Sequence, residues 1–205
     1  MSMRWSTLIS QTLATTRPFD EITILVAWAA GIAVSLILVP NALGVAGAGL
    51  AVLMTAIAIV DARRFIIPNE LTAAALALGF LHAAIQGPVV EALANAALRG
   101  AVLAVAFLSL RVLYRWIRGR DGIGLGDVKL AGVAGVWLDW WVLPVAIEIA
   151  ALALLAVYAM RLLQGRASVR LMTKLPFGLF FAPAIWLGWL LESALFPIPS
   201  AGLLQ

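Results

Sequence analysis

The feature that most constrains this chain is a series of long apolar stretches, because about 20 mostly apolar residues can cross a bilayer as one helix. Seven such stretches can be delimited in the sequence, at residues 22–40, 44–60, 70–87, 96–117, 127–141, 142–163 and 176–195. They leave no room between them for a sizeable soluble domain. The sequence therefore predicts an all-α, polytopic integral membrane protein with about seven transmembrane helices.

The composition supports a membrane environment and limits the chemistry. Hydrophobic residues make up 64% of the chain and charged residues 12%, against roughly 45–50% and 25% in soluble proteins. There is no cysteine, and His82 is the single histidine, so the chain has neither the thiolates nor the histidine cluster of a typical zinc site. We expect neither a metal site nor a bound cofactor.

The fifth stretch is too short for its boundary with the sixth to be set by length alone. Residues 127–141 would rise only about 22 Å as a helix, against a hydrocarbon core of about 30 Å. Merging them with residues 142–163 would give one implausibly long span and would reverse the side of the basic residues that follow. We therefore predict two helices with a turn near residues 140–144.

The positions of lysine and arginine indicate how the chain is oriented, because basic loops stay on the cytoplasmic side. Basic residues precede the first stretch, follow the second, and surround the loops after the fourth and sixth; only Arg99 falls toward the other side. A cytoplasmic N-terminus accounts for this distribution. The net charge of +4 then reflects orientation, and it predicts contact with the lipid bilayer rather than with nucleic acid.

This topology divides the chain into three parts. Residues 1–21 are expected to form a short cytoplasmic lead-in, because the first apolar stretch is too long for a removable signal peptide and lacks its small-residue cleavage site. Residues 22–195 are expected to form a single membrane-embedded domain. Residues 196–205 are expected to form a short periplasmic tail.

Asp61 is the first of two acidic residues that stand out by their position. Charged side chains cost roughly 2.5–3.5 kcal/mol each inside a membrane helix, so they tend to be paired or functional. Asp61 ends the second stretch, and the residues that follow include Arg63, Arg64, Pro68 and Asn69. Pro68 disfavours helical geometry in the preceding residue, and Asn69 can cap the next helix. Taken alone, Asp61 is adequately explained as an interfacial carboxylate paired with a neighbouring arginine.

Asp127 is the second, and it follows the glycines Gly122, Gly124 and Gly126. Glycine lets the backbone approach another segment closely, and an aspartate at this point can cap the helix that follows. Taken alone, Asp127 is adequately explained as such a cap. A phosphate-binding loop is a weaker alternative, because the Walker pattern and a strand–glycine–helix unit are absent.

Together, Asp61 and Asp127 suggest a chemistry that neither suggests alone. The predicted topology places both at helix ends on the cytoplasmic side, where a partly dry site still admits water. Two close carboxylates cannot easily both ionise, so one acts as base on a water molecule while the other, protonated, polarises a carbonyl. Such a pair hydrolyses a peptide bond without a metal or a nucleophilic side chain, and it titrates as a unit.

Three segments resemble the type IV prepilin peptidases, membrane aspartic proteases that share a Gly-x-Gly-Asp signature with presenilin. The first segment is Asp61 with residues 67–69, the second is residues 124–130, and the third is residues 175–183. Their occurrence in this order makes the resemblance specific. Besides the two aspartates, the residues that match are Pro68, Asn69, Gly124, Gly126, Lys129, Pro176, Phe177 and Gly178.

The resemblance implies that Asp61 and Asp127 are catalytic residues that remove basic leader peptides from type IV prepilins, Flp-type prepilins or pseudopilins. It also implies an enzyme of the bacterial inner membrane, with its active site at the cytoplasmic face. The apolar helix of the substrate would begin directly after the cut. Lys129 would act on Asp127 or on the substrate, although contact with a lipid phosphate explains it equally well.

The chain also departs from the family pattern. Longer members carry an extra N-terminal cytoplasmic region with paired cysteines and also methylate the new pilin N-terminus. This chain has no cysteine and no room for that region, so we expect no methyltransferase activity. The layout is similar to the short enzymes of tight-adherence (Flp-type) pilus systems. Leu179 stands where family members often have proline.

Two other functions stay open from the residues alone. A small transporter or channel would use Glu148, His82 and the glycine-rich stretches as a polar path, although polar residues are scarce along these stretches. A non-catalytic scaffold for an envelope machine would not require the carboxylate pair. Glu148 and His82 are each also explained by a hydrogen bond between helices.

Overall fold

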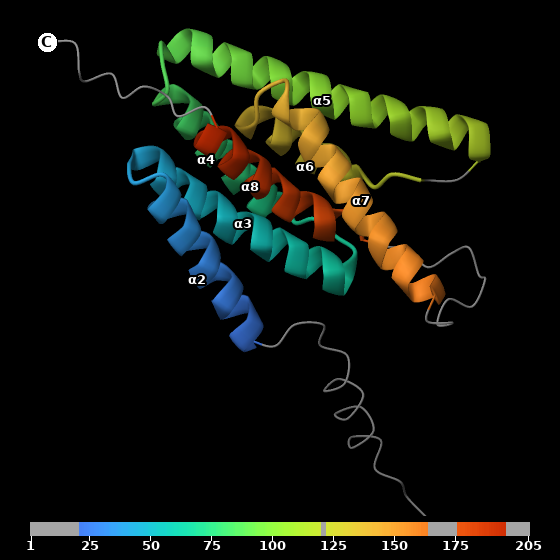
Figure 1. Ribbon diagram of the computed structural model, residues 1–205. Helices are drawn as coiled ribbons and strands as arrows, with labels where there is room; N and C mark the ends of the chain where they lie inside the picture. The colour runs from blue at the N-terminus through green and yellow to red at the C-terminus, as the bar shows by residue number, and fades with distance from the viewer. Residues whose placement is uncertain (1–20, 120–121, 164–175, 196–205) are drawn as a thin grey trace, which may run out of the picture.

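The computed structural model describes residues 21–119, 122–163 and 176–195, which form seven α-helices and no strand. Figure 1 labels them α2 (Glu21–Leu38), α3 (Ala42–Arg64), α4 (Asn69–Ala84), α5 (Val89–Arg118), α6 (Leu125–Trp137), α7 (Val142–Leu163) and α8 (Gly178–Leu195). The all-α prediction is confirmed. The predicted lead-in before Glu21, the tail 196–205, and the basic residues Arg166, Arg170 and Lys174 lie outside the described residues.

Five of these helices, α2, α3, α5, α7 and α8, are long and apolar enough to cross a membrane. The other two, α4 and α6, have 16 and 13 residues, which correspond to roughly 24 and 20 Å of rise against a hydrocarbon core of about 30 Å. The architecture is that of a polytopic membrane protein. The number of spans and the side of the N-terminus stay predictions.

The predicted helix boundaries differ from the observed ones where hydropathy and helix length diverge. Helix α5 begins at Val89 instead of the predicted residue 96. Its first turns include the polar Glu91 and Asn95, so hydropathy alone does not include them in the predicted span. Two helices do replace the single long span at residues 127–163, but the turn between them lies at residues 138–141. Pro144 therefore falls within the first turn of α7, where a missing N–H is tolerated.

Helix α8 lies at the centre of the bundle and packs against α3, α6 and α7. Helix α5 packs on α6 and α2 packs on α3, so that α2 and α5 occupy opposite sides of the molecule (Figure 1). The core forms where α3, α6 and α8 meet. Its buried side chains include Leu50, Met54, Ile57, Leu130, Val133, Phe181, Ile185 and Trp189.

Helices α5 and α6 approach each other at their backbones. A Cβ atom at Gly135 of α6 would lie 2.5 Å from the carbonyl oxygen of Arg99 in α5, and one at Gly100 would lie 3.0 Å from the carbonyl oxygen of Gly132. Small residues at such contacts are typical of membrane helices, which associate through close packing rather than through the hydrophobic effect. This contact holds the short helix α6 firmly in the bundle.

His82 links α4 to α8 near the end of the bundle where these two helices finish. The ring is 5% exposed, and the Nε1–H of Trp189 donates a hydrogen bond to its Nε2 at 3.0 Å. The predicted hydrogen bond between helices is therefore confirmed for His82. It is wrong for Glu148, which is exposed on α7 and makes no hydrogen bond with the described residues.

We expect Trp189→Phe to lower the free energy of unfolding by about 2–4 kcal/mol, because it removes the indole N–H that donates to His82 and also part of a fully buried ring that packs on Gly47. The measurement is reversible unfolding in detergent micelles. Trp116→Phe is the matched control, since Trp116 is 83% exposed, and it should change stability by less than about 0.5 kcal/mol. Equal stability of the two variants would show that the buried indole, with its bond to His82, does not stabilise the fold.

Candidate active site

Four helix ends meet at one end of the bundle. Helix α3 ends there and α4 begins there after a short loop, while α6 and α8, which are distant in sequence, also begin there. The Leu179 N–H donates to Asp61 Oδ2 at 3.0 Å, and Lys129 Nζ donates to Asn69 Oδ1. These two hydrogen bonds join the first segment identified in the sequence to the third and to the second. The three segments therefore converge at one place.

Asp61 lies in the last turn of α3 and is buried, with 6% of its surface exposed. Its partner, the Leu179 N–H, belongs to the first turn of α8, where backbone donors have no partner within the helix. The next two N–H groups, those of Phe180 and Phe181, both donate to the Phe177 carbonyl. The N-terminus of α8 thus directs a free donor, and the positive end of its dipole, at the carboxylate.

Gly178 lies directly against this carboxylate. A Cβ atom at position 178 would be 2.7 Å from Asp61 Oδ2 and 2.9 Å from Ile67 Cδ1, both closer than side chains ordinarily approach. Only glycine lets the first turn of α8 come this near to Asp61. The residues before it, Pro176 and Phe177, are half-buried, and the Phe177 ring packs on Phe181 at 5.1 Å between centroids.

Asp127 is half-buried in the first turn of α6. The helix begins two residues earlier than predicted, with Gly124 at the cap position, so the expectation that Asp127 is the cap is wrong. Its Oδ2 instead accepts a hydrogen bond from the Gly124 N–H at 3.2 Å, which holds the side chain back over the start of the helix. Asp127 lies near enough to Asp61 for the two charges to interact.

Ile67, the first residue of the segment 67–69, joins the two glycine-containing segments, although the sequence predicts no separate role for it. It is 6% exposed, and a Cβ atom at Gly126 would be 3.0 Å from the Ile67 Cβ. The same side chain contacts the position of Gly178. An isoleucine directly before a proline, in a loop beside two arginines, was the signal that could have identified it.

The loop between α3 and α4 carries the remaining first-segment residues. Pro68, rather than Asn69, occupies the cap position of α4, and the Asn69 side chain accepts from Lys129 instead, so the predicted Asn69 cap is wrong. The Pro68 carbonyl accepts a hydrogen bond from Thr72 Oγ1 at 2.7 Å. At the start of the loop, Phe65 adopts a left-handed conformation, with φ 55° and ψ 35°, which is strained for a non-glycine residue.

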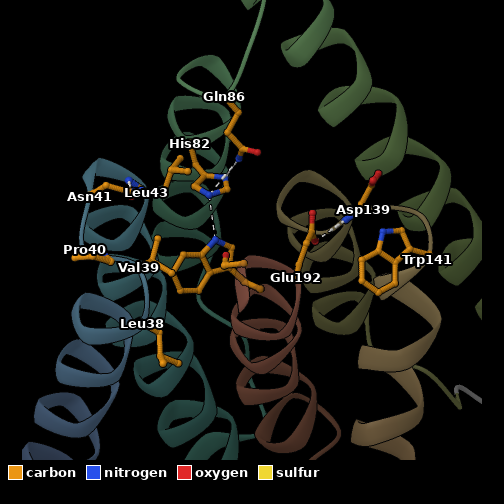
Figure 2. Close-up of a pocket in the computed structure, with 12 residues that line it drawn as sticks. Leu38, Val39, Pro40, Asn41, Leu43, His82, Gln86, Asp139, Trp141 and Glu192 are labelled. Atoms are coloured by element: carbon orange, nitrogen blue, oxygen red, sulfur yellow. Dashed lines mark hydrogen bonds between the residues drawn. The ribbon is translucent and has the colours of Figure 1, made fainter. Parts of the chain in front are cut away.

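A separate cavity of about 470 Å³ lies at the opposite end of the bundle, beside the start of α3 and the end of α4. Figure 2 shows His82, Gln86 and Glu192 around it, with Glu192 accepting from the Asp139 N–H at 3.1 Å. Glu148 does not line this cavity. The structure therefore does not bring His82 and Glu148 together as the transporter hypothesis requires.

The site at the aspartate end provides two carboxyl groups, one buried and one half-buried, beside backbone donors. Such groups can exchange a proton with water and with a bound carbonyl. Within residues 21–119, 122–163 and 176–195, no group of three or more histidine, aspartate or glutamate side chains is placed to hold a metal ion. The arrangement is suited to acid–base hydrolysis by the carboxyl groups themselves.

Comparison with known proteins matches residues 48–160 to the model of the type IV leader peptidase family. A prepilin leader peptidase/N-methyltransferase of Burkholderia pseudomallei (strain 1026b) is 35% identical over 144 residues, which cover 70% of this chain and 45% of the relative. A counterpart from Pseudomonas aeruginosa is 32% identical over 142 residues, 67% of this chain and 46% of the relative.

With a shorter relative, the aligned region covers more of the relative's length. Leader peptidase HopD of Escherichia coli is 35% identical over 132 residues, which cover 63% of this chain and 82% of HopD. The chain thus spans about half the length of the Burkholderia and Pseudomonas relatives and most of HopD. No solved structure matches the chain.

Proposed function

This chain belongs to the type IV leader peptidase family, and on that premise we propose that it is a membrane aspartic endopeptidase. Its substrates are type IV prepilins, Flp-type prepilins or pseudopilins, from which it removes the basic leader peptide. The observation that supports this most directly is the hydrogen bond from the Leu179 N–H to Asp61, which brings segments 118 positions apart to one carboxylate.

In the proposed mechanism Asp61 and Asp127 act as one unit. One carboxylate takes a proton from a water molecule, whose oxygen attacks the carbonyl carbon of the scissile peptide bond. The other, protonated, donates its proton toward the carbonyl oxygen and stabilises the tetrahedral intermediate. When the C–N bond breaks, the proton held by the first carboxyl moves to the departing nitrogen. The products are a leader with a free carboxylate and a pilin with a free amine.

The surrounding residues position the pair. Gly178 and the Leu179 N–H hold Asp61 from α8, and the Gly124 N–H holds Asp127 from the start of α6. Lys129 holds the start of α4 against α6 through Asn69. We assign these residues positioning roles rather than contacts with the reacting atoms.

We further propose that the site lies at the cytoplasmic face of the bacterial inner membrane. The distribution of lysine and arginine supports this orientation, because Arg63, Arg64 and Lys129 all fall at the aspartate end. A basic leader would then remain in the cytoplasm while the apolar helix of the substrate enters the bilayer. The scissile bond between them would come to rest at the depth of Asp61.

Cleavage of a prepilin by the purified protein in detergent or in liposomes tests this function. Mass spectrometry should detect loss of the leader as a single cut directly before the apolar helix. A prepilin with its leader lysines and arginines replaced by glutamine serves as the control for recognition of charge. If none of a panel of type IV, Flp-type and pseudopilin precursors is cleaved, the proposed function is wrong.

The new pilin N-terminus should carry no methyl group. The chain contains no cysteine, whereas the family resemblance associates methylation with longer members that carry paired cysteines in an extra region. The same cleavage reaction is run with S-adenosylmethionine, and the mass of the mature pilin is compared with that of the unmodified sequence. An added methyl group would contradict this prediction without affecting the assignment as a peptidase.

A further inference from the structure

A second cavity opens beside Asp61, between α2, α3 and α8. It has a volume of about 280 Å³, and none of its lining residues is charged. Leu179 lines the cavity while its N–H is bonded to Asp61, and Ala58 and Ile59 lie three and two residues before Asp61 on α3. The apolar groove therefore lies next to the candidate catalytic carboxylate, and Leu179 belongs to both.

The groove leads away from Asp61 along the helices. Ala51 lies seven residues before Ala58 on α3, and Trp186 lies seven residues after Leu179 on α8, and all four line the groove. Seven residues are about two helical turns, or roughly 10 Å. The groove thus follows the bundle from the aspartate end toward its middle, which is the path of a chain that passes the active site and enters the bilayer.

The walls of the groove suit the side chains of an apolar helix. The walls include Ala27, Ala51 and Ala58. Their small side chains leave space for another helix to approach, as at close contacts between membrane helices. The hydroxyl of Thr55, which also lines the groove, donates to the Ala51 carbonyl at 2.7 Å and so needs no polar partner in the groove. A volume just below the usual 300 Å³ for ligand sites fits a few aliphatic side chains rather than a whole helix.

We propose that this groove binds one face of the first two turns of the substrate's apolar helix, directly after the scissile bond. This inference rests on the proposed function, because it takes a prepilin as the occupant. The position of the groove next to Asp61 favours a substrate over a lipid, because the part of the substrate that follows the cut must occupy the space beside the site. The groove is then a specificity-determining subsite, and it selects substrates by the apolar side chains that follow the cut.

The first test fills the groove from α2 with Ala27→Phe. Ala27 is exposed, so the larger side chain need not disrupt the core. Two substrates are compared: a complete prepilin, and a short peptide that contains the leader and the cut site without the apolar helix. Ala27→Phe should lower the ratio of kcat/KM for prepilin to kcat/KM for peptide by about tenfold, mainly through KM for prepilin. Ala29→Phe, an exposed position on the same helix outside the groove, should leave the ratio unchanged.

The second test does not depend on turnover. A photoreactive residue is placed at position 27 of the Asp127→Asn variant, and the full chain is irradiated in liposomes with prepilin. The expected product is an adduct between position 27 and the first two turns of the substrate helix; a photoreactive residue at position 29 should give little of it.

Three outcomes separate the hypotheses. A wild-type enzyme that cleaves prepilin while position 27 captures only lipid would overturn the groove proposal and identify an acyl chain as its occupant. An equal loss of both substrates in Ala27→Phe would also overturn it. Failure of the wild-type enzyme to cleave any prepilin would instead refute the proposed function on which the inference rests.

Discussion

Replacing either Asp61 or Asp127 with asparagine is expected to reduce prepilin cleavage by on the order of 10²- to 10⁴-fold, the usual contribution of a positioned general acid or base. Asparagine keeps the shape of the side chain but can neither take the proton from water nor return it. The double variant should be about as inactive as either single variant, because groups that act as a unit are not additive. The measurement is the initial rate of leader loss by mass spectrometry.

Glu91→Gln is the matched control for this loss. Glu91 is an exposed carboxylate at the start of α5, at the opposite end of the bundle from Asp61. The Glu91→Gln variant should therefore cleave prepilin at the wild-type rate. The amount of each variant in the membrane fraction and its unfolding in detergent show whether it has inserted and folded. Substantial cleavage by well-folded single variants of both aspartates would refute the catalytic assignment.

Gly178→Ala is expected to lower kcat/KM by about 10²-fold, the typical cost of displacing a catalytic group by about 1 Å. The added methyl group would meet Asp61 Oδ2 at 2.7 Å and Ile67 Cδ1 at 2.9 Å, so the carboxylate or the first turn of α8 must move. Both obstacles are side-chain atoms, and we therefore expect the fold to persist. Steady-state kinetics with prepilin measure the effect.

Gly132→Ala is the corresponding control, because a Cβ atom there would meet the Ala104 Cβ at an ordinary 3.6 Å. Both changes place alanine at a helical glycine, so both reduce the conformational entropy of the unfolded chain to a similar extent. Gly132→Ala should retain activity within about twofold of wild type. If Gly178→Ala is equally active, the close approach of α8 to Asp61 has no catalytic role.

The elements of this fold follow largely from hydropathy, and their ends do not. Apolar stretches identify all seven described helices, including α4 and α6, which are shorter than the hydrocarbon core. A chain segment in lipid must satisfy its backbone hydrogen bonds internally, and a helix does so. Hydropathy is insensitive to polar turns that extend a helix, which is why the start of α5 was placed too late. Capping depends on local geometry, and for this reason Asn69 and Asp127 were wrongly expected to cap.

The candidate site was predictable as a set of residues but not as an arrangement. Asp61 and Asp127 stand out in the sequence as acidic residues at the ends of apolar stretches. The third segment is predicted only from the resemblance to the prepilin peptidases. The arrangement depends on how α8 packs between α3 and α6. This packing brings Ile67 against two glycine positions and places the Leu179 N–H at Asp61. Backbone donors in particular carry no residue-type signal.

The hydrogen bond between Leu179 and Asp61 has a consequence for the time course of synthesis. The two residues are separated by 118 positions, which a ribosome takes roughly 6 to 24 s to translate at 5–20 residues per second. During that interval α3 is already made, yet its carboxylate lacks the donor and the glycine that α8 supplies. The newly made chain would therefore not cleave neighbouring prepilins until α8 has been inserted.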